Sequence, residues 1–81
     1  MTDAERALTV AREQERLAAA SRGDILPAAP GDYVRGRVSY RVQGWIVGAG
    51  VIGRHIPAWR IWNPISESYQ EIPQADVLVY G

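Results

Sequence analysis

Two short apolar runs constrain the fold of this chain more than any other feature, Gly44–Gly48 and Ala58–Trp62. Both consist mainly of β-branched and aromatic residues, and glycine, proline or asparagine lies at their ends. Runs of about four to eight residues with this composition are typical of strands, whereas a helix usually needs at least about ten. We therefore predict that the two runs are the central strands of a very small β-barrel, and that the chain before Gly31 is an appendage.

From Gly31 onward, apolar and polar residues alternate with the period of a β-strand. The predicted strands cover residues 33–38, 44–52, 56–62, 68–72 and 77–80. Val34 and Val38 are expected to point inward from the first strand, and Trp59 in the third is expected to belong to the core. Glycines within or beside the second strand predict bulges or a sharp bend. These are Gly48, Gly50 and Gly53.

Pro73–Asp76 is predicted to form one turn of 3-10 helix before the last strand. Five short strands with a tight turn before the last are typical of an SH3-like barrel, and a five-stranded Greek-key barrel is the alternative. The expected fold class is therefore mainly β, a small five-stranded SH3-like barrel over residues 31–81. An N-terminal α-helical arm over residues 1–23 and a Pro/Ala linker over residues 24–30 precede it.

The arm is predicted to be helical over residues 2–22. Thr2 and Glu5 have the spacing of a capping box, and Gly23 is a natural C-terminal stop. One side of this helix is a shallow alanine stripe, and we expect the arm to dock through residues on this side: Leu8, Val10, Ala11 and Leu17. The opposite face is charged and carries Arg6, Arg12, Glu13 and Arg16. Such a helix is marginal alone in water, so it needs its own barrel, a second copy or another protein to lie on.

The chain lacks the disulfides and metal sites that usually stabilise small domains. It has 81 residues, no cysteine and one histidine, which excludes disulfides and a His/Cys metal site. A domain of about 60 residues buries too little surface to be more than marginally stable. We therefore expect no cofactor, and we expect contacts with copies of itself, with other protein subunits, or with both.

Charge and hydropathy narrow the class of partner. Nine acidic and nine basic residues give a net charge of zero, which argues against a nucleic-acid binder because such proteins usually carry a basic surplus. Acidic residues occupy the place of a signal peptide's basic region, and the longest mostly apolar run, Val42–Ile52, is too short to span a bilayer. We expect no membrane partner, and a location in the cytoplasm or in a particle assembled there.

No motif commits the chain to a reaction. Gly48–Gly53 matches the dinucleotide-binding pattern G-x-G-x-x-G, but that pattern has meaning only where it opens a helix in a βαβ unit. A tryptophan-rich run follows here instead, which favours bend-forming glycines. His55 has no nucleophile or partner acid at a recognisable spacing, and no serine lies in an elbow motif. We predict no catalytic residue.

The aromatic residues are the strongest indication of a binding surface. Trp45 and Trp62 fall on the strand face opposite Ile46 and Ile61, and exposed tryptophan beside arginine is typical of protein contacts. The predicted partner-binding residues are Trp45, Trp62, Arg60, Tyr69 and Gln70. Two alternatives stay open: both tryptophans cap the open ends of the barrel, or they stack on single-stranded bases while nearby arginines meet phosphates.

Two blocks of the sequence carry a family resemblance, Gly31-Asp32-x-Val34-Arg35 and Gln43-Gly44-x-Ile46-Val47-Gly48. The resemblance resumes at Gln70 and Pro73. In these positions the chain resembles the plasmid-borne type II dihydrofolate reductases, the small trimethoprim-resistance enzymes. The resemblance covers the barrel and not the helix. It implies an SH3-like barrel and self-assembly into a tetramer with one central active-site pore.

The pore residues of that family are mostly replaced in this chain. Gly36 stands at the position of the family's pore lysine. The family's pore run Val-Gln-Ile-Tyr corresponds to Tyr69-Gln70-Glu71-Ile72 in this chain, so only the glutamine is retained. Symmetry-related Glu71 side chains without a lysine would repel the phosphates of NADPH. We therefore predict the fold and the self-assembly of this family, without its activity.

These observations predict a non-catalytic structural or protein-interaction module. We expect a repeated subunit or adaptor of a larger assembly that docks through its helical arm and a Trp/Arg face of the barrel. By analogy of architecture, this assembly is expected to be a virion or a similar particle. The alternatives are an NADPH-dependent enzyme of the type II dihydrofolate reductase kind and a small nucleic-acid-binding barrel.

Overall fold

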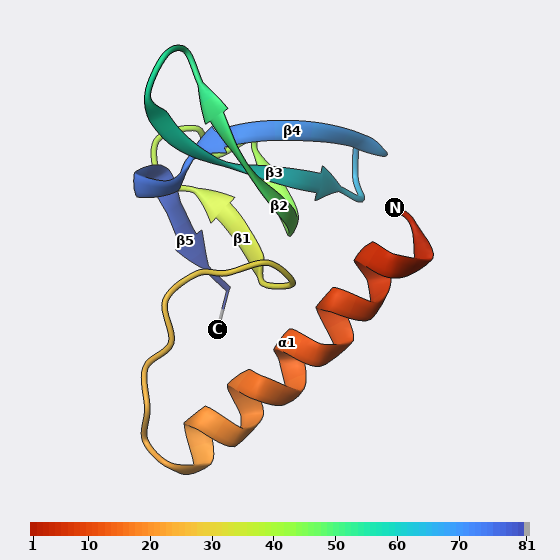
Figure 1. Cartoon of the computed structure of the whole chain (residues 1–81), viewed down its shortest axis with the longest axis vertical. Helices are drawn as coiled ribbons and strands as arrows, with labels where there is room; N and C mark the ends of the chain where they lie inside the picture. The colour runs from red at the N-terminus through yellow and green to blue at the C-terminus, as the bar shows by residue number, and fades with distance from the viewer. Residues whose placement is uncertain (81) are drawn as a thin grey trace.

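One helix and a five-stranded antiparallel sheet make up the computed structural model, which describes residues 1–80 (Figure 1). The elements are α1 (Asp3–Ser21), β1 (Tyr33–Gly36), β2 (Gln43–Ile52), β3 (Ile56–Asn63), β4 (Ser68–Pro73), η1 (Gln74–Asp76) and β5 (Val77–Val79). The mainly β class and the N-terminal helix are confirmed. The last residue of the predicted barrel range, Gly81, lies outside the described residues.

Both ends of α1 form as the sequence predicts. The Thr2 hydroxyl accepts a hydrogen bond from the Glu5 amide at 3.1 Å, and the Glu5 carboxylate accepts one from the Thr2 amide at 2.8 Å. At the other end Gly23 has a φ of 73°, and the Asp24 amide donates to the Ala19 carbonyl at 2.9 Å. This left-handed glycine cap satisfies carbonyls that the helix itself leaves unpaired.

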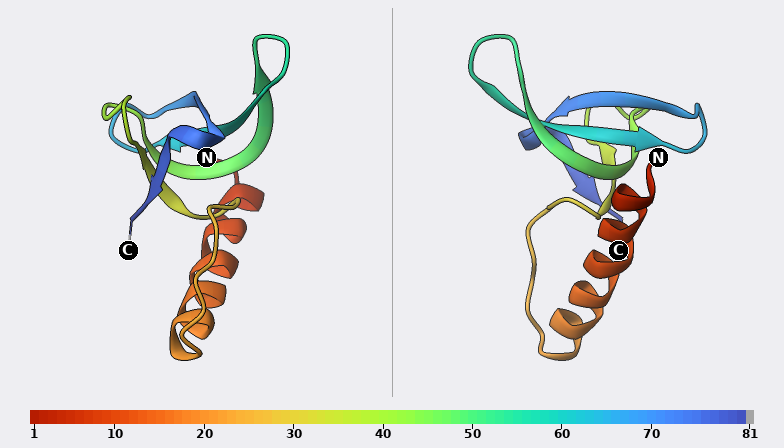
Figure 2. Two further views of the ribbon diagram at one scale, coloured as in Figure 1. Left: turned by 90° about the vertical axis from the view of Figure 1, so that its left-hand side faces the viewer. Right: turned by 45° about the vertical axis from the view of Figure 1, so that its right-hand side comes forward.

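The strand order in the sheet is β4-β3-β2-β1-β5, and all neighbours are antiparallel. A register shift between Ile46 and Gly48 marks a bulge in β2, where the sequence predicts one, and Figure 2 shows β2 curving strongly along its length. The predicted 3-10 turn is present as η1. Bulges increase local twist, which explains how a ten-residue strand bends around so small a core.

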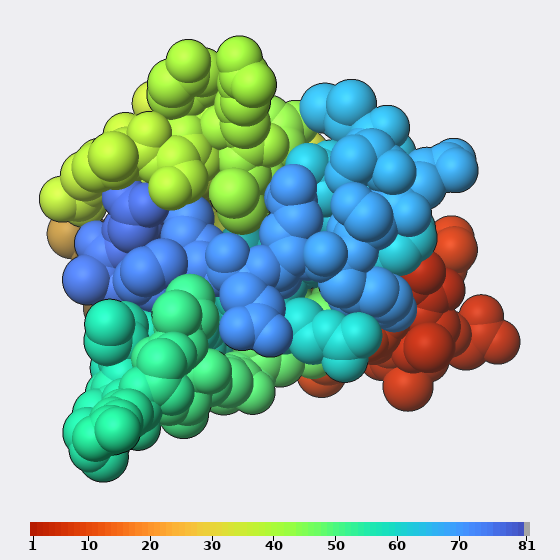
Figure 3. Space-filling model, turned by 90° about the horizontal axis from the view of Figure 1, so that it is seen from above, coloured from red at the N-terminus to blue at the C-terminus, as the bar shows by residue number. Residues whose placement is uncertain are grey.

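The outer parts of β2 and β3 form a hairpin that projects from the rest of the sheet (Figure 1). From above, its green and teal residues stand apart at one corner of the molecule, away from the red N-terminal residues (Figure 3). Its turn lies at residues 53–55, as the Gly53-Arg54 pair predicts.

Four fully buried side chains form the core, Val34, Ile46, Ile61 and Ile72. Trp59 packs against this cluster, as predicted, although it stays partly exposed. The inward orientation of Val34 is confirmed.

The prediction that Val38 points inward is wrong, because this side chain is 77% exposed. β1 ends at Gly36, and the chain turns away from the sheet before Val38. The carboxylate of Asp76 accepts hydrogen bonds from the Val38 amide at 2.8 Å and from the Ser39 amide at 3.4 Å. These bonds hold the loop to η1, a contact between distant segments that strand alternation alone does not reveal.

Candidate binding cleft between the helix and the sheet

Helix α1 lies on its own sheet through the charged face and not through the alanine stripe. Arg12 is 8% exposed and Ala19 is 2% exposed, whereas Leu8, Val10, Ala11 and Leu17 are all exposed. The expectation that the alanine side is the docking side is therefore wrong for the contact within this chain. Docking of those four residues on another subunit stays a prediction.

The carboxylate of Asp32 explains why the charged face turns inward. Arg16 donates to Asp32 from Nε at 2.5 Å and from Nη2 at 2.8 Å, and Arg12 Nε donates to Asp32 Oδ2 at 3.1 Å. The Ala29 amide adds a fourth hydrogen bond at 2.9 Å. We call Asp32, Arg12 and Arg16 the Asp32 clamp. It ties α1 to the residue directly before β1.

Further donors of the clamp bind the linker, and Arg12 Nη1 donates to the exposed carboxylate of Glu15. Arg12 Nη2 donates to the Pro27 carbonyl at 2.5 Å, and Arg16 Nη2 donates to the Leu26 and Pro27 carbonyls at 3.3 and 3.2 Å. Within residues 1–80, every buried side-chain nitrogen and oxygen has a hydrogen-bond partner. Buried charges are tolerated when they are paired and fully hydrogen-bonded, which is the case here.

Gly31 permits the close approach of helix and sheet. It has a φ of 98°, and a Cβ at this position would overlap the Leu8 carbonyl oxygen and the Cβ of Arg12. Only glycine combines this backbone angle with no side chain. Gly31 therefore allows α1 to lie within reach of Asp32.

Ion pairing makes the clamp sensitive to acid. Burial, the strongest influence, raises the pKa of Asp32, but the hydrogen bonds from Arg16, the Ala29 amide and Arg12 together outweigh it, so the pKa lies below its ordinary value. The hydrogen bond to Asp32 in turn raises the pKa of Arg16.

We therefore expect stability to fall as the pH is lowered below about 4. A carboxyl group with a lowered folded-state pKa contributes its full stabilisation above its unfolded pKa and loses it as the pH falls through the folded value. Asp76, whose pKa is lowered chiefly by the Val38 amide, acts in the same direction. Urea midpoints at a series of pH values between neutrality and pH 3 would measure this, and the curve for Asp32→Asn should be flatter. An unchanged midpoint down to pH 3 would contradict the expectation.

An aromatic row crosses four strands on the face opposite the core. Tyr33 pairs with Trp45, Trp45 with Trp62, and Trp62 with Tyr69. The rings of Tyr33 and Trp45 meet edge to face with centroids 5.0 Å apart, and those of Trp62 and Tyr69 with centroids 4.9 Å apart. Beyond the end of the row, Tyr80 packs on Tyr33 at 5.4 Å.

The first turns of α1 reach one end of the aromatic row. The Tyr69 hydroxyl donates to Glu5 Oε1 at 2.7 Å, which raises the pKa of Tyr69. Arg60 lies over the Tyr69 ring, with its guanidinium carbon 4.1 Å from the ring centroid. The Tyr69 end of the row is thus occupied by this chain's own groups.

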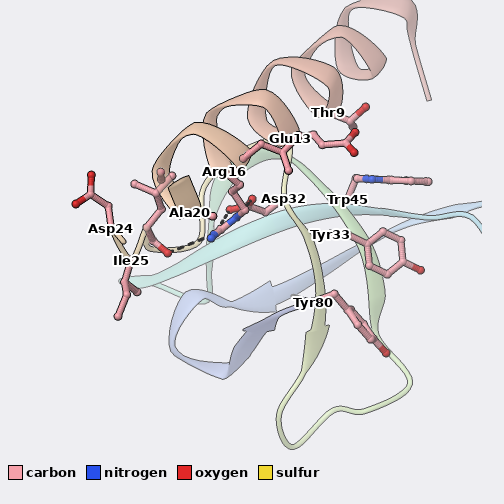
Figure 4. Close-up of a pocket in the computed structure, with 14 residues that line it drawn as sticks. Thr9, Glu13, Arg16, Ala20, Asp24, Ile25, Asp32, Tyr33, Trp45 and Tyr80 are labelled. Carbon is pink, nitrogen blue, oxygen red and sulfur yellow. Dashed lines mark hydrogen bonds and ion pairs between the residues drawn. The ribbon is translucent and has the colours of Figure 1, made fainter. Parts of the chain in front are cut away.

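The Tyr33 end of the aromatic row lines a cleft of about 790 Å³ between the helix, the linker and the sheet. Figure 4 shows Tyr33, Trp45 and Tyr80 on its sheet side and Thr9, Glu13 and Arg16 on its helix side. Further lining residues include Leu17, Ile25 and Leu26. Volumes of about 300–1,000 Å³ with an apolar lining and few polar groups are typical of binding pockets.

Glu13 is an exposed carboxylate on the rim of this cleft. Arg16 and Asp32 pair with each other, and Asp24 pairs with Arg22 at 2.9 Å. Across the described residues Glu13 forms no ion pair, although it stands next to the aromatic wall (Figure 4). The cleft therefore combines three aromatic rings with one available carboxylate.

The structure brings together most of the predicted partner-binding residues. Trp45, Trp62 and Tyr69 belong to the aromatic row, and Arg60 stacks on Tyr69. Both tryptophans are half-buried. Gln70 is separate, because alternation places it on the other side of β4 and its side chain accepts a hydrogen bond from Asn63 Nδ2 at 3.0 Å.

Sequence analysis did not find the Asp32 clamp or the role of Tyr33 and Tyr80 in the cleft. Arg12 and Arg16 are four residues apart and share one helix face, which signals a common partner. Nine acidic residues are candidates for that partner, and the sequence does not distinguish among them.

No family model, no curated protein and no solved structure matches this chain. Within residues 1–80, no three His, Cys, Asp or Glu side chains are grouped so that they could hold a metal ion. In the same part of the chain, no helix combines the length and the apolar composition needed to cross a membrane.

Proposed function

We propose that this chain is a non-catalytic protein-interaction module that assembles with copies of itself and with other subunits. The observation that carries the proposal is the distribution of large hydrophobic side chains. Among the described residues 1–80, eleven of them are exposed, whereas only four are fully buried. Single exposed hydrophobic residues are ordinary, but contiguous apolar surface is typical of interaction sites.

The exposed hydrophobic residues gather at particular places. Leu17, Ile25 and Tyr80 border the cleft, and Val51 and Ile56 lie on the projecting β2–β3 hairpin. Ile25 is 96% exposed, which is costly for an isoleucine unless another surface covers it. A partner that covers these residues would remove apolar area from water.

The small core supports the same proposal. Four fully buried side chains and no disulfide leave the fold with little internal stabilisation. Anything that binds only the folded state stabilises it by mass action. Assembly would therefore supply the contacts that the isolated chain lacks.

We also propose that the sheet is an SH3-like barrel. The strand order β4-β3-β2-β1-β5, the bulged and curved β2, and the 3-10 turn between β4 and β5 support this assignment. Small barrels of this kind serve many unrelated functions, so the fold by itself does not specify a partner.

Sedimentation velocity over a range of protein concentrations tests the proposal. We expect the average mass to rise above the 8.9 kDa of one chain as the concentration increases. A chain of this size can offer only a small interface, so the association is expected in roughly the micromolar-to-millimolar range. Ile25→Ser should weaken association, whereas Ile65→Ser, which removes an exposed isoleucine outside the cleft, should leave it unchanged. A strict monomer with α1 intact by circular dichroism would contradict the proposal.

A further inference from the structure

The tip of the β2–β3 hairpin, Val51–Ile56, carries exposed apolar side chains. It projects from the body of the molecule at the end remote from the C-terminal half of α1 (Figure 1). Val51 is 60% exposed and Ile56 is 51% exposed, and Arg54 and His55 at the turn are exposed as well. Apolar residues that project this far cannot be covered by the chain's own core.

Arg54, at the tip of the hairpin, carries a charge opposite to that of Glu13 in the cleft. Within residues 1–80 it forms no ion pair, and the hairpin tip around it contains no acidic residue. An arginine side chain both pairs with a carboxylate and stacks on aromatic rings. The cleft offers both partners, Glu13 on the helix side and Tyr33 and Trp45 on the sheet side.

Gly50 supplies a further observation on the hairpin. A Cβ at this position would have no atom of this chain within 4 Å, and its φ is not in the left-handed region. No contact inside the molecule therefore requires glycine at position 50 of β2, and glycine within a strand weakens it. Unexplained strand glycines often mark the close approach of another backbone.

We infer that the hairpin tip of one copy of this chain docks in the cleft of the next copy, with Arg54 placed between Glu13 and the aromatic wall. The inference rests on the proposed function and specifies its contact. The hairpin projects at the end of the molecule remote from the C-terminal half of α1 (Figure 1), and that half of α1 lines the cleft, so the contact joins different molecules. Zero net charge means that copies do not repel each other as like-charged bodies.

The proposed contact joins two different surfaces, so each subunit keeps one free hairpin and one free cleft. Such a heterologous contact repeats from copy to copy and produces a closed ring or an open filament. It differs from a symmetric dimer, in which both molecules use the same patch.

Two charge reversals test this geometry. Glu13→Arg reverses the charge of the cleft and leaves the hairpin unchanged, whereas Arg54→Glu reverses the charge of the hairpin and leaves the cleft unchanged. Both residues are exposed, so circular dichroism and Tm should match those of the unmodified chain. By sedimentation velocity, each variant alone should associate at least about tenfold more weakly, because like charges now face each other.

An equimolar mixture of the two variants is the decisive sample. In the mixture, Arg54 of the Glu13→Arg variant meets Glu13 of the Arg54→Glu variant, and the two reversed charges also meet as an opposite pair. Association should therefore be restored to about that of the unmodified chain. Arg41→Glu, which changes another exposed arginine without an ion pair in the described residues, should associate like the unmodified chain.

The outcomes separate this inference from the proposed function. If the unmodified chain associates but the mixture stays monomeric, or either single reversal associates normally, the head-to-tail contact is wrong and the proposed function stands. If the unmodified chain is monomeric at every concentration, the proposed function fails and this inference fails with it.

Discussion

Asp32→Asn is expected to destabilise the chain by about 3–5 kcal/mol, the effect of removing one partner from a buried ion pair. The Asp32 side chain is 1% exposed, and the Arg12 side chain beside it is 9% exposed. Asparagine keeps the volume but removes the charge, so two guanidinium groups lose their only buried carboxylate. A chain of this length has a total stability of roughly 4–12 kcal/mol, so most of the molecules could unfold.

Thermal and urea unfolding followed by circular dichroism measures this effect. We expect Tm to fall by more than about 12 °C, since about 1 kcal/mol shifts the Tm of a small domain by about 4–8 °C. The helical signal should be lost with or before the sheet, because an isolated helix of this length is marginal.

Asp24→Asn is the matched control for Asp32→Asn. Asp24 pairs with Arg22, but their side chains are 56% and 60% exposed. Exposed pairs contribute about 0–1 kcal/mol, so this variant should unfold close to the unmodified chain. Equal Tm values for the two variants would show that the Asp32 clamp does not hold the helix to the sheet.

Gly44→Ala has the second-largest expected effect, a destabilisation of about 3 kcal/mol or more, which combines backbone strain with overpacking. Gly44 has a φ of 142°, and a Cβ there would overlap the Trp62 carbonyl oxygen and come within 2.9 Å of the Asn63 Cα. These are backbone atoms of the neighbouring strand, so no side-chain rotation can relieve the overlap. Urea unfolding would measure the loss as a lower midpoint.

Gly50→Ala provides the comparison for Gly44→Ala. It lies in the same strand, has no left-handed φ, and offers open space for a Cβ. Alanine should leave stability unchanged or raise it by up to about 1 kcal/mol, because glycine loses more conformational entropy on folding. Similar losses for both variants would mean that strand propensity, and not the approach of β3, determines the cost at Gly44.

Local patterns predicted most of the secondary structure. The capping box at Thr2, the cap at Gly23 and the 3-10 turn before the last strand depend on neighbouring residues, so their signals are complete within a few positions of the chain. Val38 shows the limit of such patterns. Strand alternation continues through it in the sequence, but a contact with Asp76 in a distant segment ends β1 earlier.

The candidate site could be predicted only in part. Alternation placed Trp45 and Trp62 on the face opposite Ile46 and Ile61, which the structure shows. The alignment of Tyr33, Trp45, Trp62 and Tyr69 into one row depends on the register of three strand pairs, including a bulge. Register is a property of pairing between strands, so periodicity within one strand cannot determine it.

The sequence by itself determined which segments become helix and strand. It also determined that the chain has more hydrophobic side chains than so small a core can bury. Only the tertiary structure decided which face of α1 turns inward. Hydrophobicity favoured the side of Leu8, Val10 and Leu17, but one buried carboxylate at Asp32 turned Arg12 and Arg16 toward the sheet instead. A buried charge must be paired, and the position of its partner is defined only once the chain has folded.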